Sequence, residues 1–275
     1  MPSLKNKTII ITGASRGIGR AMAVKFASEG ANIVAAAKTL DKHPKLPGSL
    51  NETVKAVQEA GGRGVAVRMD VRFPEQVQNM VDTAIDIFGG IDALVNNAGA
   101  ISLTPVEKTP LKIFDRMHTV NDRAVFLCAQ MVLPHLKKAQ NPHILNLSPP
   151  LNLDPRWLKD YGPYTRSKFS MSLLTVAMAG EFKKYGIAVN SLWPKTIIAT
   201  AAIEFAVGDK SMLQYCRKPQ IMADAAHLLL SSKDLEWSGQ LFVDEDVLRT
   251  RGIDDFNKYA VNPDFSDKIK KDLYV

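Results

Sequence analysis

Two side chains in the sequence YTRSK, Tyr164 and Lys168, have the types and spacing needed for acid–base chemistry. They are four residues apart in a helical pattern, so both emerge on one face of the helix. A phenol has a pKa of about 10, and a neighbouring lysine cation favours the phenolate and lowers that pKa. Proton transfer by Tyr164 at neutral pH then becomes feasible. Taken alone, the same pair also fits an amphipathic helix without a catalytic role.

A glycine-rich turn near the start of the chain has the features of a phosphate site. Residues 7–19, KTIIITGASRGIG, join an apolar β-rich run to a helical pattern through Gly13, Gly17 and Gly19. A strand that ends in glycines and leads into a helix presents free backbone N–H groups and the positive end of the helix dipole. The glycines suit a tight turn, the approach of a pyrophosphate and close helix packing. Dinucleotides and adenosyl methyl donors both use such turns, so the ligand stays open at this point.

Short apolar runs alternate with helical patterns along the chain, which predicts βαβ units. After the first strand, further strands are predicted at residues 32–37, 64–70, 92–99, 143–148, 187–193 and 240–245. After the first helix, further helices are predicted at residues 53–62, 74–90, 111–139, 164–184 and 223–232. The predicted fold class is α/β, a Rossmann-type doubly wound parallel sheet with helices on both faces. We expect residues 1–275 to form a single domain, with a core at about 5–247 and a C-terminal extension at 248–275. Ligands of such sheets bind beyond the carboxyl ends of the strands, where the strand order reverses.

The composition narrows the class of protein. The chain has 275 residues, 46% of them hydrophobic, and 35 basic against 28 acidic side chains. The lysines are scattered and no basic helix with interleaved aromatic residues is present, so nucleic-acid binding is not expected. Cys128 and Cys216 form no metal-ligand or disulfide spacing, which fits a reducing compartment and predicts no metal. No segment is long and apolar enough for a membrane span or a signal peptide, and a cytoplasmic protein is expected.

Four sequence motifs follow one another in a characteristic order: TGASRGIG at 12–19, NNAG at 96–99, Asn121 within HTVND, and YTRSK at 164–168. Together they resemble the successive motifs of the short-chain dehydrogenase/reductase family, over about residues 5–247. The resemblance implies hydride transfer between a nicotinamide cofactor and a substrate carbon that carries a carbonyl or secondary alcohol.

The resemblance also implies roles for individual residues. Tyr164 would exchange a proton with the substrate oxygen, Lys168 would hold the nicotinamide ribose and depress the tyrosine pKa, and Asn121 would order a water on the proton path. Asp70 and Val71 match the positions that bind the adenine. The cofactor-binding residues predicted from the motifs and from charge are Gly13, Ser15, Arg16, Gly17, Ile18, Gly19, Lys38, Asp70, Val71, Asn97, Gly99, Tyr164 and Lys168. Asn96 and Asn97 fit equally well as purely structural ties across the sheet.

The residue after the second strand bears on the choice of cofactor. NAD-specific folds usually place an acid there for the ribose 2′-hydroxyl, whereas a 2′-phosphate requires a cation. This chain has Ala37 and then Lys38, and Arg16 in the glycine turn supplies a second positive charge. Thr39 adds a hydroxyl donor. The predicted cofactor is NADP(H).

Two positions depart from the family pattern. The family usually has a serine about thirteen residues before the tyrosine, where this chain has Leu151; alignment on the strand instead places Pro149 there, with Ser148 one residue early. Proline has no hydroxyl, so Ser148 either replaces the catalytic serine or caps the strand end.

The second departure lies in PKTIIAT, where Lys195 stands in place of the usual glycine and Thr200 comes one residue late. Lysine adopts positive φ less readily than glycine, so the nicotinamide-side loop is expected to differ. Ile197 or Ile198 would meet the carboxamide through backbone groups.

The leading hypothesis is an NADP(H)-dependent oxidoreductase acting on a small carbonyl or alcohol substrate. The alternative is a non-catalytic NADPH-binding sensor or scaffold, which the missing serine motivates. A methyltransferase is a third reading, but it leaves Tyr164, Lys168 and Lys38 without a role.

Further expectations concern the substrate and the assembly. An apolar or lipid-like substrate is suggested by side chains near loops that should border the site, namely Trp157, Trp193, Phe205 and Met212; such residues also serve as core packing. The family resemblance implies a homotetramer or homodimer packed through the helices that carry Asn121 and Tyr164.

Overall fold

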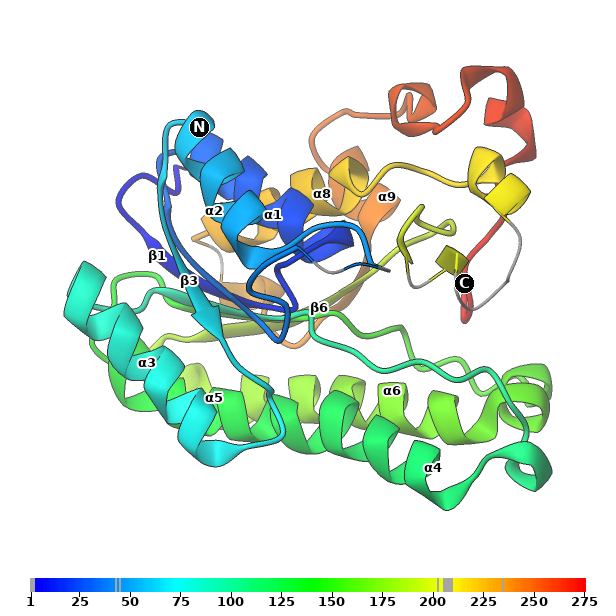
Figure 1. Ribbon diagram of the computed structural model, residues 1–275, viewed down its shortest axis with the longest axis horizontal. Helices are drawn as coiled ribbons and strands as arrows, with labels where there is room; N and C mark the ends of the chain where they lie inside the picture. Colours follow the sequence, from blue (N-terminus) through cyan, green and yellow to red (C-terminus); the bar gives the residue numbers. More distant parts are fainter. Residues whose placement is uncertain (1–2, 43, 45, 202, 205–209, 234) are drawn as a thin grey trace.

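A seven-stranded parallel sheet runs through the centre of the molecule in the order β3-β2-β1-β4-β5-β6-β7 (Figure 1). The computed structural model describes residues 3–42, 44, 46–201, 203–204, 210–233 and 235–275. The strands are β1 Thr8–Thr12, β2 Asn32–Ala37, β3 Arg63–Arg68, β4 Ala93–Asn96, β5 His143–Asn146, β6 Ala188–Trp193 and β7 Leu241–Val243. The chain moves outward from β1 to β3 and then returns to the other side of β1 with β4. The predicted fold class is confirmed, and the order reverses between β1 and β4, where ligands of such sheets bind.

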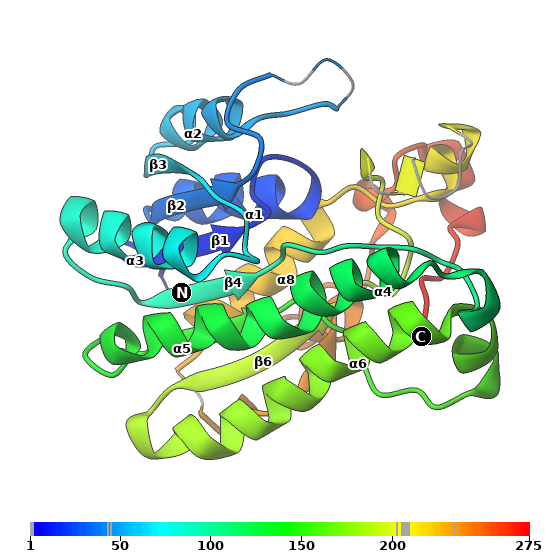
Figure 2. The same cartoon turned by 60° about the horizontal axis from the view of Figure 1, so that its bottom comes forward.

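Helices cover both faces of the sheet (Figures 1 and 2). They are α1 Gly17–Ser28, α2 Leu50–Glu59, α3 Pro74–Phe88, α4 Leu111–Met117, α5 Ala124–Leu136, α6 Pro155–Phe182, α8 Gln220–Ser231 and α9 Asp244–Arg249. Helices α1, α2 and α8 lie on one face, and α3, α5 and α6 on the other. Within the described ranges, no helix combines the length and the apolar character that crossing a membrane requires.

The first strand shows why an uninterrupted apolar run forms this architecture. All five residues of β1 are buried, and successive side chains of a strand point to opposite faces. Ile9 and Ile11 belong to the core beneath α1 and α8, whereas Ile10 belongs to the core beneath α3 and α5. A strand covered on both faces therefore needs apolar residues at every position.

Local signals explain the boundaries of α2 and α3. The side chain of Ser49 accepts a hydrogen bond from the Glu52 amide at 3.2 Å and caps the start of α2. Pro74 occupies the first turn of α3, and Gly89 ends it with a φ of 80°, a left-handed conformation that glycine adopts without steric cost.

The helix that carries Tyr164 begins earlier than the sequence predicted. The sequence predicted a helix from residue 164, but α6 starts at Pro155. The Asp154 side chain accepts a hydrogen bond from the Arg156 amide, and proline suits the first helical position. The helix is kinked at Tyr161, which has non-helical angles and lies two residues before Pro163. The early start places Trp157 on the same helix as the catalytic candidates.

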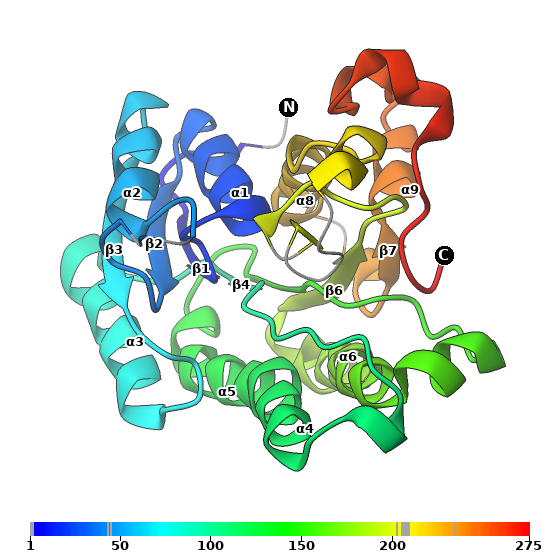
Figure 3. The same cartoon turned by 45° about the vertical axis from the view of Figure 1, so that its right-hand side comes forward.

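The chain beyond α9 folds back toward the carboxyl ends of the strands. It contains two short 3-10 segments, Asn257–Tyr259 and Pro263–Lys268. The second packs against the 3-10 segment Lys210–Tyr215, with the Tyr215 and Phe265 rings 5.1 Å apart. Figure 3 shows this extension in red, returning on the side of the molecule where α9 lies. Its last residues reach the loop that follows β6.

Candidate active site

The glycine turn between β1 and α1 leaves the start of the helix open to an anion. Gly13 and Gly17 have φ values of 70° and 56°, which side-chain-bearing residues rarely adopt. A Cβ on Gly13 would lie 2.9 Å from the Cα of Ala98, so the turn also requires glycine for close packing. Arg16 is the N-cap residue, and no side-chain hydrogen bond caps the helix there. The first N–H groups of α1 have no helical partner, and this cradle fits a pyrophosphate.

Asn97 holds the turn in place rather than pointing away from it. Its Nδ2 donates to the carbonyl oxygens of Thr12 and Gly13 at 2.9 and 3.1 Å. A Cβ on Gly19 would lie 2.5 Å from this same nitrogen, so the glycine makes room for the tie. Asn96 likewise donates to Asn146 on β5. Both asparagines therefore make structural ties across the sheet, and cofactor binding by Asn97 stays a prediction.

Positive groups flank the adenosine side of the turn. The Arg16 guanidinium donates to the carbonyl oxygens of Pro47 and Gly48 at 2.6 and 3.0 Å, which draws that loop over the turn. A Cβ on Gly48 would lie 2.6 Å from the Ser15 carbonyl oxygen, another sign of close packing. Lys38 follows β2 directly and is exposed. The two cations therefore lie on elements that meet at the same edge of the sheet.

Asp70 is engaged by a neighbouring arginine. The two oxygens of its carboxylate share the Arg72 Nε–H, and Oδ2 also accepts from Nη2 at 2.7 Å. Burial raises the pKa of Asp70, but the hydrogen bonds and charge of Arg72, together with the charge of Lys38, outweigh burial and the pKa is lowered. The neighbouring Val71 is buried. The carboxylate of Asp70, which was predicted to bind the adenine, is thus ionised and held in place by Arg72.

Asn121 lies in a π-helical turn, His118–Arg123, between α4 and α5. Its Oδ1 accepts from the Ala100 amide at 2.8 Å, and its Nδ2 donates to the Ala100 carbonyl and to the Ser167 Oγ, both at 2.9 Å. Gly99 lies against the same side chain. Both amide hydrogens are therefore used, and a water at this residue would have to donate to it. Asn121 joins the loop after β4 to the helix that carries Tyr164.

Tyr164 and Lys168 are both buried, each 6% exposed. The Lys168 ammonium donates to the Leu147 carbonyl and to the Met171 sulfur, and it lies 5.1 Å from the centre of the Trp193 ring. Burial lowers the pKa of Lys168 to about 7, an effect that the charge of Asp272 opposes.

The pKa of Tyr164 moves in the direction opposite to the prediction. The sequence predicted a lowered value, but burial, with contributions from Tyr274 and Asp272, raises the pKa well above 10. Burial disfavours the phenolate, and it also drives Lys168 toward its neutral form. The structure therefore shows a neutral phenol, which can act as a proton donor.

Ser148 follows β5 by two residues and is the neighbour of Leu147, whose carbonyl accepts from the Lys168 ammonium. It is completely buried, and its Oγ has no hydrogen-bond partner within the described parts of the chain. A strand-capping role for this hydroxyl is therefore not observed. The Pro149 carbonyl is already taken by the Ser172 Oγ at 2.6 Å, and Leu151 is exposed. A buried hydroxyl without a partner is unusual, so Ser148 stays the candidate for the catalytic serine.

The loop after β6 follows a path that suits lysine in place of glycine. Lys195 is not among the non-glycine residues with positive φ in the described chain. Its amide donates to Asp244 Oδ1 at 2.8 Å, and its carbonyl accepts from the Asp272 amide at 3.1 Å. Ile198 is buried and pairs with Arg217, and Thr200 lies against Gly17. Lys195 therefore needs no left-handed backbone here, and a difference from the usual loop of the family stays a prediction.

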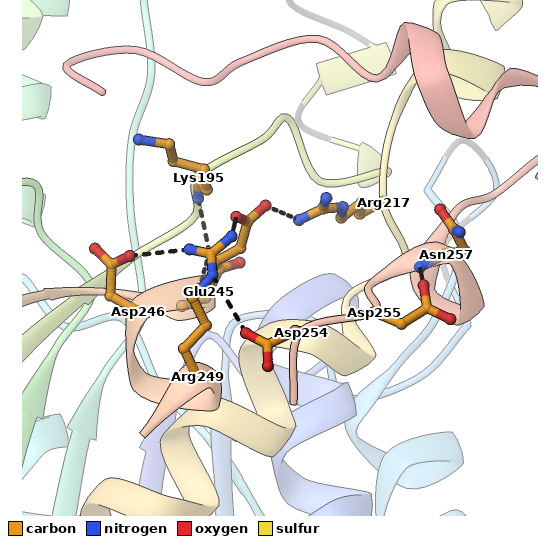
Figure 4. Close-up of polar contacts among 9 residues, drawn as sticks. Lys195, Arg217, Glu245, Asp246, Arg249, Asp254, Asp255 and Asn257 are labelled. Carbon is orange, nitrogen blue, oxygen red and sulfur yellow. Dashed lines mark hydrogen bonds and ion pairs between the residues drawn. The ribbon is translucent and has the colours of Figure 1, made fainter. Parts of the chain in front are cut away.

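A charged network supports that loop from below (Figure 4). Arg217 and Arg249 approach the Glu245 carboxylate from two sides, the latter at 2.7 Å, while the Lys195 ammonium points away from it. Burial raises the pKa of the adjacent Asp244 to about 6. The network fixes the start of α9, and through Asp244 it fixes the Lys195 backbone.

Sequence reasoning missed the contribution of the extension to this site. A buried apolar group, the Tyr164 cluster, consists of Met117, Tyr164, Phe169, Trp193 and Tyr274. Trp157 packs against it as expected, whereas Met212 is not part of it. The Met212 carbonyl accepts from the Cys216 sulfur, and the Met212 sulfur accepts from the Lys270 ammonium at 3.2 Å. Phe205 lies outside the described residues. In the extension, the short apolar and aromatic sequence LYV at 273–275 was the feature that could have indicated burial against the site.

The profile of the family described as short chain dehydrogenase matches residues 7–207. The chain belongs to the short-chain dehydrogenase/reductase family. Hydroxysteroid dehydrogenase-like protein 2 of Danio rerio is 50% identical over 256 residues, which are 93% of this chain and 61% of that protein. The chain thus spans about three fifths of the length of this relative.

Solved structures of the family show the same fold. A short chain dehydrogenase from Mycobacterium thermoresistibile has a TM-score of 0.92 and 41% identity, covering 99% of this chain and 96% of that one. A short chain dehydrogenase from Mycobacterium paratuberculosis, solved with NAD bound, has a TM-score of 0.74 and 26% identity, covering 90% and 99%. The chain therefore shares its fold with both dehydrogenases, the second of which binds NAD.

Proposed function

We propose that the protein is an NADP(H)-dependent oxidoreductase that transfers hydride to or from a carbonyl or secondary alcohol. The observation that carries the proposal is the placement of Tyr164 and Lys168 one turn apart on α6, with the Lys168 ammonium donating to the carbonyl of Leu147. The next residue, Ser148, is buried and its hydroxyl has no hydrogen-bond partner within the described residues. Family membership supports the reaction class. The nicotinamide supplies the hydride when it is bound.

The neutral phenol of Tyr164 suits proton donation during carbonyl reduction. Its raised pKa keeps the proton on the side chain throughout the neutral range. The Ser148 hydroxyl would donate a hydrogen bond to the substrate oxygen and orient it toward Tyr164. Lys168 would bind the nicotinamide ribose. Because its pKa is about 7, it would gain or lose a proton near neutral pH at little cost in free energy.

The preference for NADP(H) rests on charge at the end of β2. Ala37 leaves no acid for a ribose 2′-hydroxyl, and the exposed Lys38 lies near enough to influence the Asp70 carboxylate. The M. paratuberculosis relative binds NAD, so family membership alone does not decide between the two nicotinamide cofactors. A cation without a competing acid favours the 2′-phosphate. Arg16 would add a second positive charge.

The surroundings of Tyr164 support an apolar substrate. Besides the Tyr164 cluster itself, the side chains that pack against it are those of Ala100, Ile101, Leu103, Ile113, Trp157, Leu273 and Val275. They come from the loop after β4, from α4, from the start of α6 and from the extension. A predominantly apolar wall with few polar groups is typical of a small-molecule site.

We further propose a homodimer or homotetramer in the cytoplasm. Large apolar side chains on the outer faces of α5 and α6 are half exposed, namely Phe126, Leu173 and Val176 at 50, 57 and 49%. Such patches commonly mark interfaces. Light scattering that finds only a monomer would contradict the assembly.

The proposal is tested by titration with NADPH and NADH, followed by a panel of ketones and aldehydes. We expect tighter binding of NADPH and measurable carbonyl reduction by the wild type. Tyr164→Phe should lose turnover by a factor of about 10²–10⁴ and keep its affinity for NADPH. NADPH binding without any turnover would favour a sensor, and tighter binding of NADH would overturn the cofactor assignment.

A further inference from the structure

Residues 270–275 form a strap across the end of the site. Thr196 and Lys271 make an antiparallel bridge, and the Ile197 amide donates to the Lys270 carbonyl at 2.9 Å. The Asp272 amide donates to the Lys195 carbonyl at 3.1 Å. The strap thus pairs with the loop after β6, on the nicotinamide side of the proposed site.

The strap also places the Tyr274 side chain among three aromatic rings, those of Trp157, Phe169 and Trp193. The Tyr274 ring centre lies 5.5 Å from that of Trp157, 5.3 Å from Phe169 and 5.9 Å from Trp193. Its hydroxyl lies 3.1 Å from the Thr165 Oγ1. These tilted and edge-on contacts are the geometries that aromatic pairs prefer. As a result, Tyr274 is 2% exposed.

Two hydrogen bonds from side chains to carbonyl groups of the strap hold it against these rings. The Trp193 indole N–H donates to the Leu273 carbonyl at 2.9 Å, and the Asn152 amide donates to the Tyr274 carbonyl at 3.1 Å. Trp193 also lies over the Lys168 ammonium at 5.1 Å. The strap is therefore connected to Lys168 through a single side chain.

Tyr274 has a φ of 71°, a left-handed conformation that is unfavourable for a bulky residue. Such a conformation costs about 1–3 kcal/mol and persists only when the surroundings over-determine it. The three ring contacts and these two hydrogen bonds do so here. Glycine would fit this backbone at lower cost, yet the chain has a large aromatic residue. Strain of this kind is concentrated at functional sites.

The Tyr274 ring lies close to Tyr164, the proposed proton donor, which gives a reason for the left-handed backbone of Tyr274. Tyr274 belongs to the same buried cluster as Tyr164 and hydrogen-bonds to the next residue of α6, Thr165. The cluster lies at the carboxyl end of the sheet, the region where substrates of this architecture bind. Leu103 and Ile113 complete its apolar surroundings from the loop after β4 and from α4.

We propose that Tyr274 is a specificity-determining residue whose ring fills the apolar space beside Tyr164 and thereby limits the size of the carbonyl compound that reaches the Tyr164 hydroxyl. This inference rests on the proposed carbonyl chemistry. Removal of the ring would leave a space lined by Trp157, Phe169 and Trp193, and an apolar space of that kind accepts apolar groups. Bulkier ketones would then reach the Tyr164 hydroxyl.

The test compares kcat/KM for the smallest and the bulkiest ketone that the wild type reduces. Tyr274→Gly removes the ring and suits the left-handed backbone, so the strap can keep its path. We expect the ratio of bulky to small substrate to rise about tenfold or more. Addition of 4-methylphenol, which has the shape of the missing side chain, should return the ratio toward the wild-type value.

Control variants distinguish a size-limiting role of the Tyr274 ring from a general role in packing. Tyr274→Phe keeps the ring and should keep the wild-type ratio, although it loses the hydrogen bond with Thr165. Phe265→Ala removes an aromatic contact of the same extension that lies outside the Tyr164 cluster, and it should also leave the ratio unchanged. If Tyr274→Gly does not fold, Tyr274→Leu decides, with an expected increase of the same sign.

Two results would overturn the inference. The first is a folded Tyr274→Gly or Tyr274→Leu protein that binds NADPH and reduces ketones with an unchanged ratio, which leaves the proposed function intact. The second is a wild type that reduces no carbonyl compound, which removes the proposed function and this inference with it.

Discussion

The two ends of the proposed cofactor site are built in different ways. The glycine-turn end depends on backbone conformation within one short segment, where Gly13 and Gly17 adopt left-handed angles and α1 begins without a side-chain cap. The substrate end is assembled from distant segments: the hydrogen bonds that hold Tyr274 and Leu273 join residues 80 to 122 positions apart. One end is thus encoded locally, whereas the other exists only when the whole chain has folded.

The two ends also differ in electrostatics. Around the glycine turn, Lys38 is exposed and Arg16 is partly buried, so charge is available to a phosphate. Around Tyr164 the titratable groups are withdrawn from water, and burial shifts the pKa of Lys168 and of Asp272 toward 7. The first arrangement suits ion binding, and the second suits proton transfer.

After Tyr164→Phe, the largest effect is expected from Ser148→Ala at the substrate end. A hydroxyl that hydrogen-bonds the reacting oxygen contributes a factor of about 10²–10³ to kcat. The Ser148 Oγ makes no hydrogen bond within the described protein, so stability should not fall. Ser172→Ala is the matched control, because its Oγ donates to the Pro149 carbonyl; we expect it to reduce stability more than Ser148→Ala does. Unchanged steady-state kinetics in Ser148→Ala would remove this serine from the mechanism.

Gly13→Ala tests the glycine-turn end. The new Cβ would lie 2.9 Å from the Ala98 Cα at a φ of 70°, so we expect the free energy of unfolding to fall by about 2–3 kcal/mol. NADPH affinity should fall with it. Gly180→Ala in α6 is the control, because a Cβ there meets nothing within 4 Å, and it should stabilise the protein by about 0.4–1 kcal/mol. Equal denaturation midpoints for the two variants would show that the turn is not constrained as described.

Lys38→Ala tests whether the charge at the end of β2 selects NADPH over NADH. Loss of an exposed charge-assisted contact to a 2′-phosphate should weaken NADPH binding about tenfold, with little change for NADH. Lys55→Ala on α2 removes another exposed lysine, which is paired only loosely with Glu59 at 3.9 Å, and should alter neither affinity. Fluorescence titration of both cofactors provides the measurement. A parallel loss of NADH affinity would mean that Lys38 acts on the fold rather than on the phosphate.

The smallest effect is expected from Asp272→Asn and depends on pH. Burial, with a contribution from the charge of Asp244, raises the pKa of Asp272 to about 7. The folded protein therefore holds this proton to a higher pH than the unfolded chain does, and its stabilising contribution is lost as the pH rises through 7. The gain in Tm from Asp272→Asn should thus be larger at pH 8 than at pH 5, by roughly 3 °C. Asp264→Asn, an exposed residue of the same extension, is the control, and a gain that is equal at both pH values would contradict the burial of Asp272.

The sequence predicted the parallel sheet, its strands and the glycine turn because these features depend on local pattern. A strand covered on both faces must be apolar throughout, and a left-handed turn must be glycine, so both leave a direct trace in the residues. It could not predict the direction of the Tyr164 pKa, because that depends on how deeply the rest of the chain buries the phenol.

By itself, the sequence determined the family, the fold class and the residue types that carry the chemistry. Only the tertiary structure decided which of these groups are satisfied and which are free: Asn97 is used to fix the glycine turn, whereas Ser148 is buried without a partner. It also decided that residues 270–275 reach the site. Contacts between segments so far apart follow from the path of the folded backbone, and no short-range pattern in the extension specifies where its aromatic side chain will be buried.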